Sequence, residues 1–119
     1  MTKPVNTELL KGSSVTLILS SLDRRDMYGY EIARTLEVAS KGSFLMNEGT
    51  LYPILHKLEQ DGAVASYWEE HEGRRRKYYR LTKSGRTLLS TKQREWLDFK
   101  SAMDQVLTFE ARLNASWSC

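Results

Sequence analysis

Side chains able to contact nucleic acid recur at helical spacing in the stretch Asn47–Gly62, which reads N-E-G-T-L-Y-P-I-L-H-K-L-E-Q-D-G. Hydroxyl, phenol, imidazole and ammonium groups can hydrogen-bond to base edges and phosphates. Near the N-terminus of a helix, such groups suit a helix that enters a DNA major groove end-first. In a recognition helix over 50–61, the side chains expected to do so are Thr50, Tyr52, Pro53, His56 and Lys57.

An apolar stripe on the other side of this stretch would anchor it. Four residues at i, i+3, i+4 and i+7 predict one buried helix face: Leu51, Ile54, Leu55 and Leu58. Because proline is tolerated in the first turn, Pro53 predicts a helix start close to Thr50, with Asn47 or Thr50 as the N-cap. Taken alone, the stretch fits an ordinary surface helix of a small α protein equally well.

A basic segment follows. Residues 63–68 and 77–81 are β-compatible, and a polar loop over 69–73 joins them. The resulting hairpin would be a wing, in which residues 73–80 lie on the phosphate backbone or in a minor groove. Its expected contacts are Arg74, Arg75 and Lys77. The alternative is a solvated charged face that the glutamates of the loop neutralise.

The preceding chain supplies the elements that must position these groups. Helical patterns over 7–22 and 28–40 precede the central stretch, which gives a helix-turn-helix. The apolar run 44–46 is too short for a helix and could pair as a strand or pack under the next helix. We therefore predict a mainly α (α+β) fold: a winged helix-turn-helix domain over 7–82, a C-terminal dimerisation helix over 83–109, and a disordered tail over 110–119.

The last helix should start after the N-cap Thr82 and run from Lys83 to about Thr108. Its apolar residues recur at roughly heptad spacing over about 39 Å. This row of apolar residues would be exposed to water unless another chain covered it. It therefore predicts a two-fold homodimer formed by this helix and the first one. The alternative is a helix that folds back on its own domain. The expected interface residues are Leu10, Leu89, Trp96, Leu97, Met103, Val106 and Leu107.

Composition limits the other classes of function. The chain has 119 residues, a net charge of +3 and a single cysteine, Cys119, which predicts a cytoplasmic protein without an intrachain disulfide. No apolar run reaches the length of a membrane span. The two histidines, His56 and His71, make no sensible zinc site with that cysteine, and there is no nucleophilic triad or phosphate loop. We expect no enzyme activity, no metal and no cofactor.

Three segments carry a resemblance to a known family: Tyr28–Ile32 (Y-G-Y-E-I), Gly49–Glu59 (G-T-L-Y-P-I-L-H-K-L-E) and Gly73–Thr82 (G-R-R-R-K-Y-Y-R-L-T). With Gly85 in the last helix, they resemble the PadR-like bacterial transcriptional regulators, in particular the small subfamily with one C-terminal helix. The resemblance implies a dimeric winged-helix repressor and supports the DNA contacts named above. A two-fold dimer would bind a near-palindromic operator in double-stranded DNA.

The resemblance also implies an effector. Some members bind planar aromatic compounds at the dimer interface, where a tryptophan of the last helix stacks on the ligand, and Trp96 matches that tryptophan. The residues expected around such a compound are Val15, Trp96, Phe99, Lys100 and Met103. Lys100 would favour a neutral or anionic compound over a cationic one. Trp96 could equally be a plain dimer-core residue. The alternative functions are a protein–protein interaction module and an aromatic-compound binder, both without DNA binding.

Overall fold

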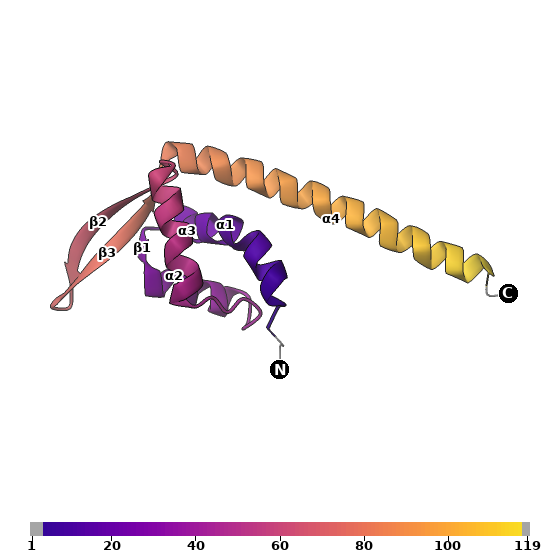
Figure 1. Ribbon diagram of the computed structural model, residues 1–119, viewed down its shortest axis with the longest axis horizontal. Coiled ribbons are helices and arrows are strands. Elements are labelled where there is room, and N and C mark those ends of the chain that lie inside the picture. The colour runs from indigo at the N-terminus through magenta and orange to yellow at the C-terminus, as the bar shows by residue number, and fades with distance from the viewer. Residues whose placement is uncertain (1–3, 118–119) are drawn as a thin grey trace. The chain divides into compact units, whose positions relative to one another are not determined.

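The structure is a computed structural model that describes residues 4–117, and it divides into two units, Met1–Leu89 and Ser90–Cys119. The first unit contains three helices and a small sheet, in the order α1 (Thr7–Arg24), β1 (Met27–Tyr28), α2 (Gly29–Ala39), α3 (Glu48–Gln60), β2 (Val64–His71) and β3 (Arg74–Leu81) (Figure 1). A long helix, α4 (Lys83–Trp117), begins in the first unit and forms the second. The predicted fold class, a winged helix-turn-helix with a long C-terminal helix, is confirmed.

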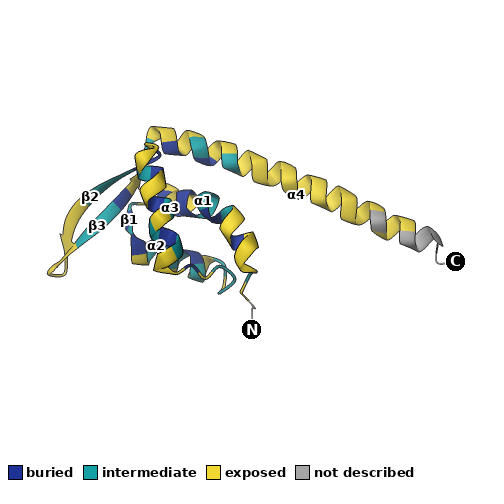
Figure 2. Ribbon diagram, in the orientation of Figure 1, coloured by how far each residue is buried: buried dark blue, intermediate teal, exposed yellow. Residues whose placement is uncertain are grey.

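The core of the first unit lies among the three helices and the inner face of the sheet (Figure 2). The stripe predicted for α3 is buried through Leu51, Leu55 and Leu58, and Ile54 packs partly against the core. A fully buried serine, Ser14, keeps its hydroxyl satisfied by donating to the Leu10 carbonyl at 2.7 Å. The apolar periodicity of α3 therefore identified its buried face.

The sheet has the strand order β1-β3-β2, and both pairings are antiparallel. β2 and β3 pair from Val64 opposite Leu81 to His71 opposite Arg74, so residues 69–71 are strand where a loop was predicted. The reason is the turn: Glu72 and Gly73 both have positive φ (52° and 77°), as a two-residue hairpin turn requires. β1 was not predicted, because two residues are too few to show a period.

The segment 44–46 forms no strand. Met46 is buried and Phe44 packs against the core, which is the second of the two possibilities that the sequence left open. In α2, Ile32 and Leu36 are buried, whereas Tyr30 is 62% exposed.

α3 begins at Glu48, two residues before the predicted start, and Pro53 lies inside it instead of in its first turn. The N-cap explains the earlier start. The Asn47 side chain accepts a hydrogen bond from the Thr50 N–H at 2.9 Å, and the Asn47 carbonyl accepts one from the Leu51 N–H at 3.0 Å. Asn47 is therefore the N-cap, which was one of the two predicted candidates.

α4 starts as predicted, because the Thr82 hydroxyl accepts a hydrogen bond from the Gly85 N–H at 3.0 Å. A Cβ at Gly85 would lie 2.7 Å from Leu81 Cδ1 and would clash with the Ala63 carbonyl oxygen, so this first turn packs directly on the start of the hairpin. The helix continues to Trp117, beyond the predicted end near Thr108 and into the predicted tail. No glycine or proline follows Gly85 to interrupt it. Residues 118 and 119 of that tail lie outside the described residues.

Among residues 4–117, no helix is both long enough and apolar enough to cross a membrane.

Candidate nucleic-acid interface

The outer surface of α3 presents three of the five predicted side chains to solvent. Pro53, His56 and Lys57 are exposed, and Thr50 is partly buried. The Lys57 ammonium lies 3.2 Å from the Asp61 carboxylate, and both side chains are more than half exposed. An exposed pair of this kind contributes little to stability, so the ammonium can exchange this partner for a phosphate or a base at small cost.

Tyr52 lies differently from the expected outward orientation. Its ring packs against Gly29, the first residue of α2, where a Cβ would lie 2.7 Å from Tyr52 Cζ. The side chain is partly buried and packs against the core. Burial, followed by the charge of Glu48, raises the pKa of the Tyr52 phenol. Tyr52 thus sets the distance between α2 and α3.

The inner face of the wing is fastened to the last turn of α3 through Glu59. The Ser66 hydroxyl donates to the Glu59 carboxylate, and this bond is the main reason that the pKa of Glu59 is lowered. The Lys77 ammonium lies 3.6 Å from the same carboxylate and 5.5 Å from the centre of the Tyr79 ring. Lys77, a predicted DNA contact, is therefore engaged at the base of the wing.

The outer face of the wing is fastened to the chain around β1. The Tyr67 hydroxyl donates to the Asp26 carboxylate at 2.7 Å. This hydrogen bond is the main reason that the pKa of Tyr67 is raised to about 12. The Tyr28 ring meets the Tyr78 ring edge-on at 5.5 Å, and the Arg76 guanidinium lies 4.3 Å from the centre of the Tyr28 ring. Both faces of the wing base are thus held by the helix-turn-helix.

The wing tip, by contrast, is open. Arg74 and Arg75 directly follow the Glu72–Gly73 turn, and both are exposed. Arg75 lies 5.0 Å over the Trp68 ring, which is itself 57% exposed. Among the described residues neither arginine forms an ion pair, although Glu70 lies opposite Arg75 in the strand register. The described glutamates of the hairpin therefore form no direct ion pair with the two tip arginines.

Sequence reasoning missed two features of this region. Trp68 could have been found, because strand alternation places it on the same face as Arg75 and opposite Lys77. The bond between Asp26 and Tyr67 joins residues 41 positions apart, and neither residue carries a local signal for it.

The residues predicted for the dimer interface fall into two groups. Leu10 and Leu89 are 7% and 4% exposed in the core of the first unit, and Val15, predicted near the effector, is partly buried there. Their own chain encloses them, so they have little surface left for a partner. The second group lies on α4 and, together with Phe99, which was predicted near the effector, is between 44% and 59% exposed: Trp96, Leu97, Met103, Val106 and Leu107.

On α4, the Trp96 and Phe99 rings lie 6.3 Å apart. The Lys100 ammonium, predicted near the effector, pairs with the Asp104 carboxylate at 3.1 Å. These contacts are all between neighbours on one helix, so α4 carries an apolar surface that the described residues of the second unit do not cover.

No group of three histidine, cysteine or acidic side chains that could hold a metal ion occurs among the described residues, and Cys119 lies outside them.

Comparison with known proteins identifies the family. Residues 18–91 match the transcriptional regulator PadR-like family. The chain is 33% identical over 101 residues to an uncharacterized protein of Lysinibacillus sphaericus, covering 84% of this chain and 93% of that protein. It is also similar to a transcriptional regulator from Clostridium thermocellum (33% identity, TM-score 0.78, 85% and 96% of the two chains).

A PadR family transcription regulator from Clostridium difficile has 40% identity and a TM-score of 0.71 over 81% of this chain and 99% of that one. The match covers the helix-turn-helix, the wing and the start of α4, which are the parts that carry the exposed cations. The chain belongs to the PadR-like family of transcriptional regulators, and is therefore a DNA-binding regulator and not an enzyme.

Proposed function

We propose that the chain is a homodimeric, sequence-specific transcriptional repressor, in which α3 reads a major groove and the wing tip holds the phosphate backbone or a minor groove. One observation supports this most strongly. Exposed cations without strong partners occur on the outer surface of α3, at Lys57, and on the wing tip, at Arg74 and Arg75. Helix and wing belong to one packed unit, so a single duplex can be held by both.

The two regions divide the work of binding. Groups on α3 would contact base edges and so discriminate between sequences: Thr50, Pro53, His56 and Lys57. Arg74 and Arg75 would contact phosphates, which gives affinity without reading bases. Tyr52 and Lys77 would act indirectly, because the first spaces α3 from α2 and the second fastens the wing to Glu59.

The dimer would form through α4. Its exposed apolar residues are unfavourable in water, and a second copy of the same helix covers them most simply. Two recognition helices related by a two-fold axis would enter successive major grooves roughly 34 Å apart, so the operator would be near-palindromic.

A planar aromatic effector would bind at that interface and release the repressor from DNA in the cytoplasm. Trp96 and Phe99 offer adjacent rings for stacking, Met103 adds an adaptable apolar surface, and Lys100 favours a neutral or anionic compound. Such a compound can induce only if it binds the dimer arrangement that does not fit DNA more tightly than the one that does.

The test is selection from a randomised duplex pool on the purified protein, with sequencing of the bound fraction at low and at higher salt. Enrichment of a near-palindrome is the expected result. DNA that is retained without any enrichment would contradict sequence-specific recognition. No retention even at low salt would instead favour the protein-interaction module.

A further inference from the structure

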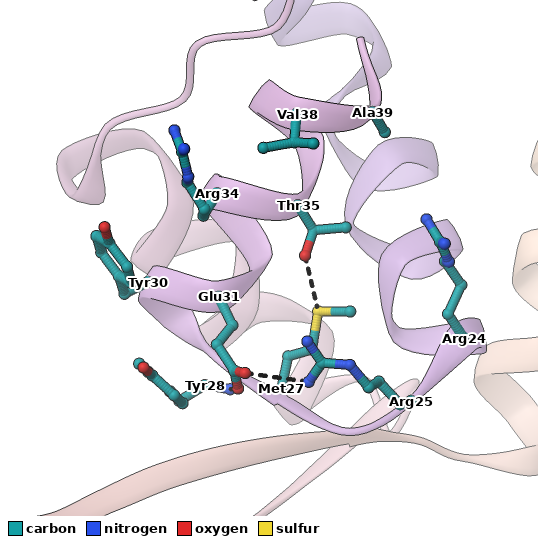
Figure 3. A pocket seen from close by; sticks show the side chains of 10 residues that line it. All are labelled: Arg24, Arg25, Met27, Tyr28, Tyr30, Glu31, Arg34, Thr35, Val38 and Ala39. Carbon is teal, nitrogen blue, oxygen red and sulfur yellow. Dashed lines mark hydrogen bonds and ion pairs between the residues drawn. The ribbon is translucent and has the colours of Figure 1, made fainter. Parts of the chain in front are cut away.

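A cavity of about 680 Å³ opens between the end of α1 and the exposed side of α2, and β1 closes one end of it (Figure 3). Its volume is in the range that holds small organic ligands. It is lined by residues 24–39 only, so it is complete in one chain and needs no partner subunit. The proposed DNA contacts do not use it.

The charges around this cavity are unbalanced. Its lining contributes three guanidinium groups, from Arg24, Arg25 and Arg34, against the single carboxylate of Glu31. Arg24 forms no ion pair with any described residue, whereas Arg34 has an exposed pair with Glu37 at 3.1 Å. Exposed pairs of this spacing are weak. A positive excess therefore faces the cavity, with Arg24 its uncommitted member.

Arg25 can bind an anionic ligand and keep its ion pair with Glu31. One nitrogen, Nη1, lies 3.1 Å from the Glu31 carboxylate, and it also reaches the Asp26 carbonyl at 3.4 Å. A guanidinium has five N–H donors, so its other edge remains for an anion. Glu31 in turn accepts a hydrogen bond from the Tyr28 N–H at 3.2 Å, which holds the carboxylate that pairs with Arg25.

The opposite side of the cavity is largely apolar. In Figure 3, Arg24 and Arg25 lie on the α1 side, and Thr35, Val38 and Ala39 line the α2 side. Val38 is 60% exposed, and the Thr35 hydroxyl is turned onto Met27 Sδ at 3.6 Å. An apolar surface thus lies open beside the unpaired cation of Arg24.

We propose that this cavity binds a small organic anion, a carboxylate or phosphate carried on an apolar or aromatic body. Arg24 and the free edge of Arg25 hold the anionic group, since guanidinium groups bind carboxylate and phosphate with charge-assisted hydrogen bonds. Met27, Val38 and Ala39 cover the apolar body. The site is separate from α4 and does not depend on the proposed function.

Phenyl phosphate is the probe for this site, with inorganic phosphate and phenol as the two halves of the same molecule. Titration of the full-length protein, followed by amide NMR shifts, should show saturable changes confined to residues 24–39. Phenyl phosphate should bind about fivefold or more tighter than either half, because only it uses both sides of the cavity.

Arg24→Gln should weaken phenyl phosphate about tenfold. The matched control, Lys11→Gln, removes an exposed cation from the same helix outside the cavity and should leave the affinity unchanged. Three results would overturn the proposal: no saturable shift up to about 10 mM, equal effects of the two variants, or shifts spread over the surface cations. Loss of DNA affinity in Arg24→Gln without phenyl phosphate binding would reassign the arginines to the DNA backbone.

Discussion

Both units of the chain contain helices with apolar residues, but the first unit buries these residues and the second leaves them exposed. In the first unit the apolar faces of α1, α2 and α3 close on one another and on the sheet, and every buried hydrophobic side chain of the described residues lies at or before Leu89. From Ser90 to Leu113 the described side chains are exposed, except for the partly covered Lys92. An apolar period therefore predicts that a face will be covered, but it does not say by which chain.

The largest expected effect is on assembly, because only the second unit leaves its apolar residues exposed. Met103→Glu with Leu107→Glu places two charges in the exposed apolar row of α4 and should convert the proposed dimer to monomers, at a cost of about 4 kcal/mol or more. Light scattering measures the mass. At 100° per residue, Ser101→Glu with Gln105→Glu puts the same charges on the opposite side of the helix and should leave a dimer. A dimer mass in both variants would remove α4 from the interface.

A glycine pair tests how tightly the first unit is packed. Gly85→Ala should lower the free energy of unfolding by about 1–3 kcal/mol, because its Cβ would collide with the Ala63 carbonyl oxygen. Gly12→Ala, in α1, has nothing within 4 Å of the new Cβ and should raise the same quantity by about 0.5–1 kcal/mol. Urea unfolding compares them. The two variants are expected to change the free energy of unfolding in opposite directions. The same change in both would therefore contradict the packing described for Gly85.

The wing tip is the exposed part of the first unit, and its variants should affect DNA without affecting the fold. Arg74→Gln with Arg75→Gln should reduce the slope of log affinity against log salt by about 2 per protomer, and so by about 4 for the proposed dimer, with a similar loss on specific and random duplexes. Fluorescence anisotropy at several salt concentrations measures the slope. Lys11→Gln serves as the control cation, and an unchanged slope in the tip variant would contradict the phosphate contacts.

The smallest expected effect concerns the fastening of the wing base. Tyr67→Phe removes the bond to Asp26 and should lower the free energy of unfolding by about 1 kcal/mol near neutral pH. Because the pKa of Tyr67 is raised to about 12 from its ordinary value of 10.0, the folded state holds the phenol proton more tightly than the unfolded state. The contribution is complete below pH 10 and is lost as the pH rises towards 12.

Urea unfolding at pH 8 and at pH 11 should therefore show a smaller difference between wild type and Tyr67→Phe at the higher pH. A difference that grows with pH would contradict the assigned cause of the shift.

Most of the first unit could be predicted from the sequence, because its helices carry full apolar periods and its hairpin carries strand alternation. The errors occurred where a local contact overrode a general rule. The Asn47 cap started α3 upstream of Pro53, and the two-residue turn at Glu72–Gly73 extended both strands. β1 and the Asp26–Tyr67 bond depend on residues distant in sequence, so no window of the chain could reveal them.

The sequence indicates the chemical type of each candidate DNA contact, but not the direction in which its side chain points. His56, Lys57, Arg74 and Arg75 are exposed, as a contact residue must be. Tyr52 and Lys77 also have side chains suited to DNA contact. In the structure, however, Tyr52 packs against Gly29 and Lys77 pairs with Glu59. A side chain that can bind a ligand can equally bind its own fold, and periodicity alone does not distinguish these uses.

The doubly fastened wing base limits the reach of each protomer. The hairpin is held as far out as Arg76, which lies against the Tyr28 ring, and only about two strand steps of roughly 3.4 Å separate that residue from Arg74 beside the turn. The free arm is therefore about 7 Å long, enough to reach about one phosphate beyond the point where the wing is held. In the proposed complex, the protein therefore fixes the distance along the DNA between the bases read by α3 and the phosphates held by the wing. Operators should vary in sequence, but the length of DNA that the protein covers should stay the same.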